Sequence, residues 1–232
     1  AIPFVNYLLT RFRISLLFGN NFVWEHGFRM NPTWVLPVIF LLSYLVGSVP
    51  FGYLLVALRQ GEDIRKIGSG NIGATNVRRI LGRKWSYAVL LLDMLKGFMP
   101  VFLTGIFLER GVSESTAQIA QVVAGIGALI GHNWTVFLGF KGGKGVATGA
   151  GIFLCIAPRA VGVCLVVFGA VRYASRFISA GSLAAAGLLP VVMYFLEKPP
   201  SFVLFSLAVS GLIVLRHSGN IKRLAKGMEN KV

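Results

Sequence analysis

Several apolar runs in this chain approach or exceed the roughly 20 residues that an α-helix needs to cross a bilayer. These runs cover residues 34–58, 85–108, 117–140, 146–171, 178–196 and 202–215. Of the 232 residues, 55% are hydrophobic and 13% are charged, whereas about 25% of a soluble domain is charged. Because only helices and closed barrels satisfy their backbone polar groups in lipid, the sequence predicts an all-α polytopic membrane protein.

The proline at position 158 interrupts the fourth run and decides the number of spans. A single helix over 146–171 would separate the basic residues of 141–144 from those of 172–176, whereas two short helices would bring them to one side. With the split, sixteen Lys and Arg lie in the loops and tail on one side and three in the turns on the other, as expected for a cytoplasmic face. We therefore expect about seven transmembrane helices, with the N-terminus of span one outside and the C-terminus cytoplasmic. Arg11, Arg13 and Arg29 would lie outside, against this rule.

Residues 1–31 mix apolar and polar residues and are too interrupted to predict a span. We expect an N-terminal extension there, either an interfacial helix or a partly disordered segment. Residues 32–232 are expected to form a single membrane-embedded domain. The net charge of +15 falls in short loops between spans, which indicates anionic lipid headgroups and an anionic substrate as partners, and no nucleic acid.

Two glycine-rich stretches lie in polar loops between the runs: GSGNIGATN over 68–76 and FKGGKGVAT over 140–148. Glycines let the backbone approach a ligand closely, and successive N–H groups can form a concave anion site. A helix beginning near Val146 would add its positive dipole end. These features favour phosphate binding at a membrane surface, with a loop that only sets topology as the alternative. Lys144 is followed by Gly145 instead of Ser or Thr, so the second stretch is not a Walker A motif.

Charged and imidazole side chains within or beside the runs are further candidates. Asp93 and Lys96 can pair at a spacing of three on one helix face, and such a pair in a membrane marks a functional site or fixes helix packing. His132 and His217 end or follow a span, and neither is followed by an aspartate five positions later. The sequence shows no Ser-His-Asp order and no metal-ligand cluster, so we expect no metal and no cofactor.

Together these motifs resemble the bacterial acyl-phosphate:glycerol-3-phosphate acyltransferase family (PlsY), from about residue 48 to residue 229. The resemblance rests on GSGNIGATN, the D-x-x-K-G pattern from Asp93, the Gly131-His132 pair, FKGGKGVAT, Ser179 with Ser182, and RHxxNxxRL from Arg216. The chain departs from the family at Thr135, where a proline is usual and where the turn before FKGGKG could change. Residues 1–31 have no counterpart in the family.

The resemblance implies an enzyme that transfers an acyl chain from acyl phosphate to the sn-1 hydroxyl of glycerol 3-phosphate, which gives lysophosphatidic acid and phosphate in phospholipid biosynthesis. It assigns catalytic roles to Lys144, Ser69, Arg79, His217 and Asn220. It assigns substrate binding to Gly68, Gly70, Asn71, Gly73, Thr75, Asn76, Asp93, Lys96, His132, Lys141, Gly142, Gly143, Gly145, Thr148, Ser179 and Ser182. Backbone donors of the 141–148 loop would stabilise the developing oxyanion.

The resemblance also implies a place in the bacterial cytoplasmic (inner) membrane, with the active site on the cytoplasmic face. A transient contact with the soluble enzyme that makes acyl phosphate would follow. The competing interpretation is a membrane transporter of an anionic phosphorylated metabolite. A transporter of this kind is often built from paired halves with Gly or Pro breaks, and the sequence contains no convincing internal repeat.

Overall fold

The computed structural model describes residues 32–108, 112–196 and 198–231, so the predicted extension over residues 1–31 lies outside the described part. The described helices are α2 (Pro32–Ser48), α3 (Phe51–Gln60), α4 (Ala74–Leu81), α5 (Arg83–Leu108), α6 (Glu114–Asn133), α7 (Val146–Ile156), α8 (Pro158–Ser175), α9 (Ile178–Phe195), α10 (Pro200–Arg216) and α11 (Ser218–Ala225), with the short 3-10 helices η2 (Ile64–Lys66) and η3 (Val136–Leu138).

The long helices are apolar enough to cross a membrane. Five helical segments meet the length and hydropathy needed, and α10 with α11 forms a sixth that is bent by 58°. Helix α7 is apolar but has only 11 residues. The prediction of an all-α multi-pass membrane protein is thus confirmed, whereas the number of seven spans and their orientation stay predictions.

Prolines decide where two of the apolar runs break. Helix α7 ends at Ile156 and α8 begins at Pro158, which confirms the predicted split; a proline lacks an N–H and is well suited to the first helical position. The run over 34–58 is also broken, since α2 ends at Ser48 and α3 begins after Pro50. This second break was not predicted. Lys96 of α5 satisfies the carbonyl of Val49 there, at 2.8 Å.

The polar segments hold more helix than the sequence predicts. Helix α4 lies inside the predicted loop over 59–84, and α11 lies in the basic tail. In α4, Val77 is fully buried against a small core with Val56, Ile64 and Val89, which gives this short helix an apolar face. Conversely, the run over 117–140 ends early as a helix: α6 stops at Asn133, and η3 follows.

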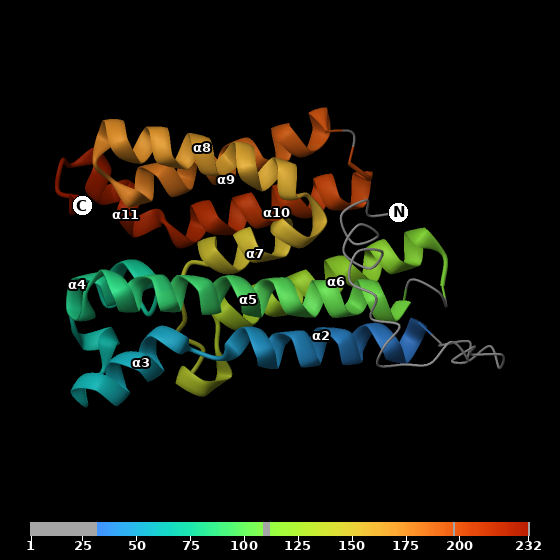
Figure 1. Ribbon diagram of the computed structural model, residues 1–232, viewed down its shortest axis with the longest axis horizontal. Helices are drawn as coiled ribbons and strands as arrows, with labels where there is room; N and C mark the ends of the chain where they lie inside the picture. Colours follow the sequence, from blue (N-terminus) through green and yellow to red (C-terminus); the bar gives the residue numbers. More distant parts are fainter. Residues whose placement is uncertain (1–31, 109–111, 197, 232) are drawn as a thin grey trace. The chain divides into compact units, whose positions relative to one another are not determined.

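Helices pack closely where glycines remove side chains from the interface. A Cβ on Gly97 of α5 would overlap the backbone of Thr148 on α7, and a Cβ on Gly151 of α7 would overlap the backbone of Met94 on α5. Such small residues let transmembrane helices gain van der Waals contact without a hydrophobic driving force. Figure 1 shows the result: α2, α5 and α6 lie on one side of α7, and α8, α9 and α10 lie on the other.

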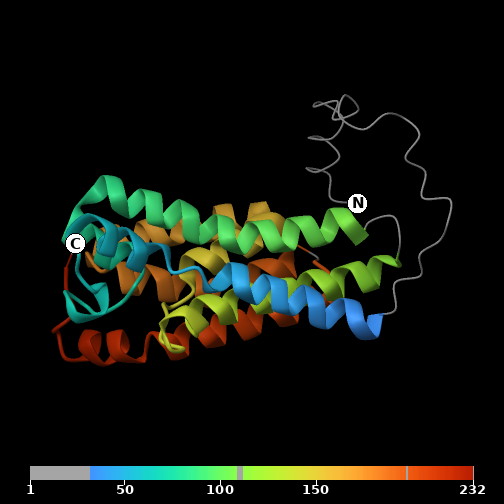
Figure 2. The ribbon, with the colours of Figure 1, turned by 90° about the horizontal axis from the view of Figure 1, so that it is seen from below.

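The short helices gather at one end of the bundle. Figures 1 and 2 show α3, α4 and α11 together at this end, beside the first turn of α5 and the C-terminus. The glycine-rich stretch over 68–76 runs into the first turn of α4, so it lies at the same end. Residues far apart in the sequence therefore meet where the bundle is most polar.

The glycine contact between α5 and α7 generates a stability prediction. Replacement of Gly151 by Ala should destabilise the fold by about 1–3 kcal/mol, because the added methyl overpacks against backbone. The matched control is Gly162→Ala on α8, where a Cβ meets nothing within 4 Å and the better helix propensity of Ala applies. Thermal unfolding in one detergent compares the two variants. Equal unfolding temperatures would contradict the proposed close packing.

Candidate functional site

A cavity of about 440 Å³ extends from the polar end of the bundle into its apolar interior. Its walls come from α4 to α11, from the loops before α4 and α7, and from the segment after α11. At the inner end the lining is apolar and includes Phe153, Val161, Leu189 and Val209. The cavity is therefore amphipathic, with a basic, hydrogen-bonding mouth and a hydrophobic interior.

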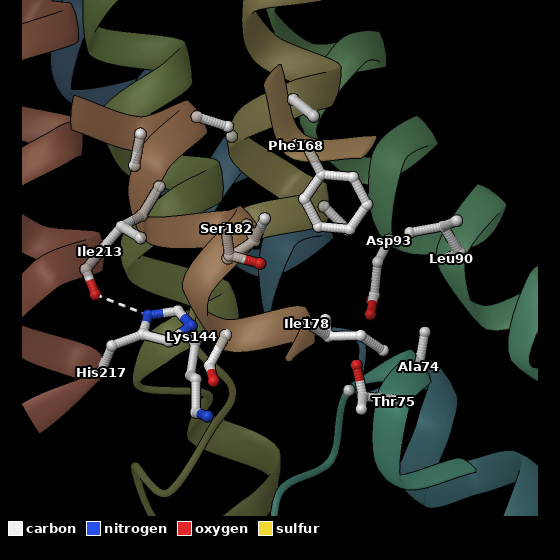
Figure 3. A pocket seen from close by; sticks show the side chains of 18 of the residues that line it. Ala74, Thr75, Leu90, Asp93, Lys144, Phe168, Ile178, Ser182, Ile213 and His217 are labelled. Carbon is white, nitrogen blue, oxygen red and sulfur yellow. Dashed lines mark hydrogen bonds between the residues drawn. The ribbon is translucent and has the colours of Figure 1, made fainter. Parts of the chain in front are cut away.

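Many of the residues predicted from the sequence line this one cavity. They are Ser69, Asn71, Gly73, Thr75, Asn76, Arg79, Asp93, His132, Lys144, Ser179, Ser182, His217 and Asn220. Others stand behind its wall or away from it: Gly68, Gly70, Lys96, Lys141, Gly142, Gly143, Gly145 and Thr148. Figure 3 shows Thr75, Asp93, Ser182, Lys144 and His217 around the same space, although they come from five different helices or loops.

Two of the helices that begin at the cavity follow a glycine and have no side-chain cap. Gly73 precedes α4 and Gly145 precedes α7, and neither offers a side-chain acceptor. No described residue accepts a hydrogen bond from the backbone N–H of Thr75 or Ala147, which line the cavity in the first turns of these helices. Free N–H groups and the positive dipole end make a helix N-terminus an anion site. These two N-termini lie at the cavity, and α9 and α11 also begin at its wall without a side-chain cap.

The first glycine-rich stretch is held in place by Asn76. This side chain is fully buried, accepts from the Ser69 N–H at 2.9 Å and donates to the Ile67 carbonyl at 3.0 Å. Gly68 has a φ of +60°, and a Cβ there would overlap the Asn76 side chain. Asn76 and Gly68 thus shape the loop, and Ser69 and Thr75 are left to face the cavity.

The second glycine-rich stretch is fixed from both sides. The N–H groups of Gly142 and Gly143 donate to the carbonyls of Asn133 and His132, so these two amides are not free for a ligand. Their carbonyls accept from Arg216 of α10, at 3.1 and 2.8 Å. The loop is therefore rigid, and it carries Lys144 and the start of α7 to the cavity.

Thr135, the departure from the family pattern, leaves the turn before this loop intact. Its φ of −70° is one that a proline also adopts. Its hydroxyl donates to the Ser48 carbonyl at 2.6 Å and accepts from the Phe137 N–H at 3.2 Å. The expectation of an altered turn therefore has no support in the backbone of this turn, and the hydroxyl adds a link to the end of α2.

Lys144 is positioned by a chain of hydrogen bonds that ends at Glu229. Its ammonium donates to the Asn220 side-chain oxygen, and the Asn220 amide donates to Glu229 at 2.7 Å. Glu229 also accepts from Ser179 at 3.1 Å and from Arg223 at 2.8 Å. Burial lowers the pKa of Lys144 to about 8, with Glu229 opposing this shift. Burial disfavours the charged form of Glu229, but hydrogen bonds from Asn220, Arg223 and Ser179 outweigh it and hold the pKa of Glu229 below its usual range.

His217 lies at the bend between α10 and α11 and is buried. Its Nδ1 is 2.8 Å from the Ile213 carbonyl, as Figure 3 shows. A carbonyl can only accept, so Nδ1 carries the proton and Nε2 of the neutral ring is an acceptor. The cavity thus gains a hydrogen-bond acceptor beside Lys144.

Asp93 and Lys96 form the predicted ion pair, at 2.8 Å, with both side chains buried. Asp93 lines the cavity and lies 3.8 Å from Nδ1 of His132. Lys96 stands behind Asp93 and divides its donors between the carboxylate and the Val49 carbonyl. Lys96 therefore does not line the cavity, where a substrate contact was predicted for it. Its position is that of a group that orients Asp93.

Sequence reasoning missed several side chains of the cavity wall. They are Arg83, Arg172, Glu229 and Asn230, whereas Arg78 and Arg223 stood in the quoted motifs or beside them without an assigned role. The signal for the arginines was their place in the basic loops, which the positive-inside rule explained without a ligand. Glu229 carried no signal, because it follows the last apolar run by fourteen positions and only the fold returns it to α9.

The chain matches the family model described as "Glycerol-3-phosphate acyltransferase" over residues 37–227. The glycerol-3-phosphate acyltransferase of Gluconobacter oxydans is 47% identical over 195 residues, which cover 83% of this chain and 90% of the relative. That of Desulfotalea psychrophila is 46% identical over 189 residues, which cover 82% and 94%.

A solved structure has the same fold. The crystal structure of PlsY (YgiH), an integral membrane glycerol 3-phosphate acyltransferase, in its glycerol 3-phosphate form, superposes with a TM-score of 0.78 at 33% identity and covers 85% of this chain and 95% of that one. The lysophosphatidic acid form gives a TM-score of 0.74 at 32% identity, over 84% and 94%. The family model, the relatives and the solved structures agree. This chain belongs to the glycerol-3-phosphate acyltransferase family.

Proposed function

We propose that this chain transfers an acyl group from acyl phosphate to the sn-1 hydroxyl of glycerol 3-phosphate, giving lysophosphatidic acid and phosphate. The observation that supports the proposal is the amphipathic cavity with the uncapped N-termini of α4 and α7 at its basic mouth. Two substrates with phosphate groups fit that mouth. The acyl chain of the donor fits the apolar interior.

The charge of the cavity suits two phosphates. Six Lys and Arg side chains and two carboxylates line it within the described residues, which leaves an excess of four positive charges. Two phosphate monoesters carry about −3 to −4 near neutral pH. Substrate binding would therefore neutralise the cavity, which supports this pair of substrates over a single small anion.

The residues divide into three groups by the charge that each would stabilise. The start of α4 receives the donor phosphate, through the free amides near Thr75. Lys144, with Asn220 and Ser182 beside it, holds the phosphate of glycerol 3-phosphate. The free amides at the start of α7 stabilise the oxyanion that develops on the acyl carbonyl, as preorganised backbone donors do in acyl transfer.

The reaction then needs little further chemistry. The sn-1 hydroxyl oxygen attacks the acyl carbon, the bond between that carbon and the phosphate oxygen breaks, and the leaving phosphate takes the hydroxyl proton. Asp93 is paired with Lys96, and Glu229 already accepts three hydrogen bonds, so neither carboxylate is free as a base. Positioning and charge stabilisation carry the rate.

The proposal extends to topology and partners. The cavity mouth coincides with the end that collects the basic loops, which favours a cytoplasmic active site in a bacterial inner membrane with seven spans. Acyl phosphate would reach the site from lipid or from a transient contact with the soluble enzyme that makes it.

Product formation tests the function. Full-length protein in lipid vesicles receives labelled glycerol 3-phosphate with acyl phosphate, acyl-CoA or acyl carrier protein in separate reactions. Lysophosphatidic acid from acyl phosphate alone is the expected result. Product from acyl-CoA instead would contradict acyl phosphate as the donor. Uptake of label into vesicles without any product would favour a transporter.

Lys144 gives a prediction with a control in the same loop. Replacement of Lys144 by Ala should lower kcat/KM by about a hundredfold, because it removes a charged donor to the phosphate of glycerol 3-phosphate, which is worth up to about 3 kcal/mol. Lys141 is exposed and does not line the cavity, so Lys141→Ala should cost much less. Initial rates on both substrates measure this. Equal losses of kcat/KM in the two variants would contradict the proposal that Lys144, and not Lys141, contacts the ligand.

The pH dependence follows from the same side chain. Because the pKa of Lys144 is lowered to about 8, its positive charge is complete well below pH 8 and is lost as the pH rises through that value. The affinity for glycerol 3-phosphate should fall in the same window. In Lys144→Arg the charge persists at all accessible pH values, so the alkaline fall should vanish even if the rate is lower. An unchanged alkaline limb in that variant would assign the titration to another group.

A further inference from the structure

One side of the cavity opens toward the lipid. Some residues line the cavity and are at the same time exposed on the outside of the bundle: Tyr87 of α5 is 66% exposed, Leu90 of α5 is 39% exposed, and Leu165 of α8 is 55% exposed. Helices α5 and α8 are both membrane-span candidates, so the outside surface at these residues faces the bilayer. The cavity therefore has a lateral opening between α5 and α8.

The packing of the helices agrees with this opening. Helix α5 packs on α4, α6 and α7, and α8 packs on α7 and α9. Helix α7, which packs on both, is only 11 residues long. In the view of Figure 3, Leu90, Phe168 and Asp93 lie on one side of the cavity, opposite His217 and Ile213.

The two edges of the opening carry the same pattern of residues. The α5 edge is Arg83, Tyr87 and Leu90, and the α8 edge is Arg172, Phe168 and Leu165. Spacings of three and four place each set on one helix face. On each edge an arginine at the polar end is followed by an aromatic ring and then by a leucine, over about 10 Å of helix.

The positive charges of Arg83 and Arg172 are available to bind an anion. Among the described residues, neither Arg83 nor Arg172 forms an ion pair with a carboxylate. Arg83 also lies in the first turn of α5, which contains no acidic residue and where the helix dipole disfavours a cation. A bound anion at this position would offset that cost.

We propose that this opening, which we call the α5–α8 portal, admits and releases a single-chain amphiphile that ends in a phosphate. Arg83 and Arg172 bind the phosphate at the level of the lipid headgroups, and the chain lies between the aromatic and leucine side chains of the two edges. The inference rests on the proposed function, in which the acyl phosphate donor and the lysophosphatidic acid product both have this chemistry. Glycerol 3-phosphate has no acyl chain and reaches the cavity through its aqueous mouth.

The test uses full-length protein in phosphatidylcholine vesicles and compares Arg83→Gln, Arg172→Gln and the double variant with wild type. The matched controls are Lys84→Gln and Arg176→Gln, each close in sequence to a portal arginine. Lys84 lies 5.7 Å from the Trp85 ring centroid, Arg176 is exposed, and neither lines the cavity.

Each portal variant should raise the KM for acyl phosphate about tenfold, the effect of removing one charged hydrogen-bond donor, whereas the KM for glycerol 3-phosphate should stay unchanged. The controls should match wild type in both constants. A purely structural role would lower the unfolding temperature and move both KM values together. A wild-type KM for acyl phosphate in the double variant, or an equal rise in the controls, would overturn the portal.

Equilibrium binding of labelled lysophosphatidic acid to the same variants separates donor from product. Weaker binding in the double variant includes the product among the portal's ligands, and unchanged binding with a raised donor KM restricts the portal to the donor. Competition by two-chain phosphatidylglycerol as strong as that by unlabelled lysophosphatidic acid would assign the arginines to bilayer headgroups and overturn the proposal. A wild type without product would contradict the proposed function, and the binding comparison would still decide the portal.

Discussion

Inside a bilayer every backbone polar group needs a partner in the protein, and this constraint governs where helices of the chain can begin and end. Where a break occurs within an apolar run, a side chain closes it: Lys96 binds the carbonyl of Val49 beside Pro50. At the cavity, by contrast, no described residue accepts a hydrogen bond from the N–H of Thr75 in α4 or of Ala147 in α7. In the proposed function these donors bind the donor phosphate and the developing oxyanion.

A rigid frame holds these donors in place. Arg216 binds the carbonyls of the second glycine-rich stretch while the end of α6 binds its amides. Glu229 orients Asn220, and Asn220 orients Lys144. The site is thus preorganised for developing negative charge, which costs no reorganisation at the moment of reaction. In the proposed reaction, the activated acyl donor then allows a site without a free catalytic carboxylate.

The sequence predicted most of the fold because its strongest signals are local. The length of the apolar runs indicated the membrane helices, and Pro158 indicated the break between α7 and α8. Helix α4 was missed because it has only 8 residues in an otherwise polar loop, and its apolar residues Ala74, Val77, Ile80 and Leu81 form a short face. The early end of α6 was missed because residues 134–140 remain apolar even though they turn.

The site divides in the same way. Motifs of glycine, lysine and asparagine indicate anion binding from the sequence alone. The charge, the hydrogen-bonding capacity and the backbone freedom of these residue types do not depend on where they lie in the fold. The sequence could not say which residues touch the cavity. Lys96 stands behind Asp93, and the amides of Gly142 and Gly143 donate hydrogen bonds to carbonyls of α6. It also gave no hint of Glu229 or of the facing edges of α5 and α8. These depend on contacts between segments up to a hundred residues apart, which only the tertiary structure decides.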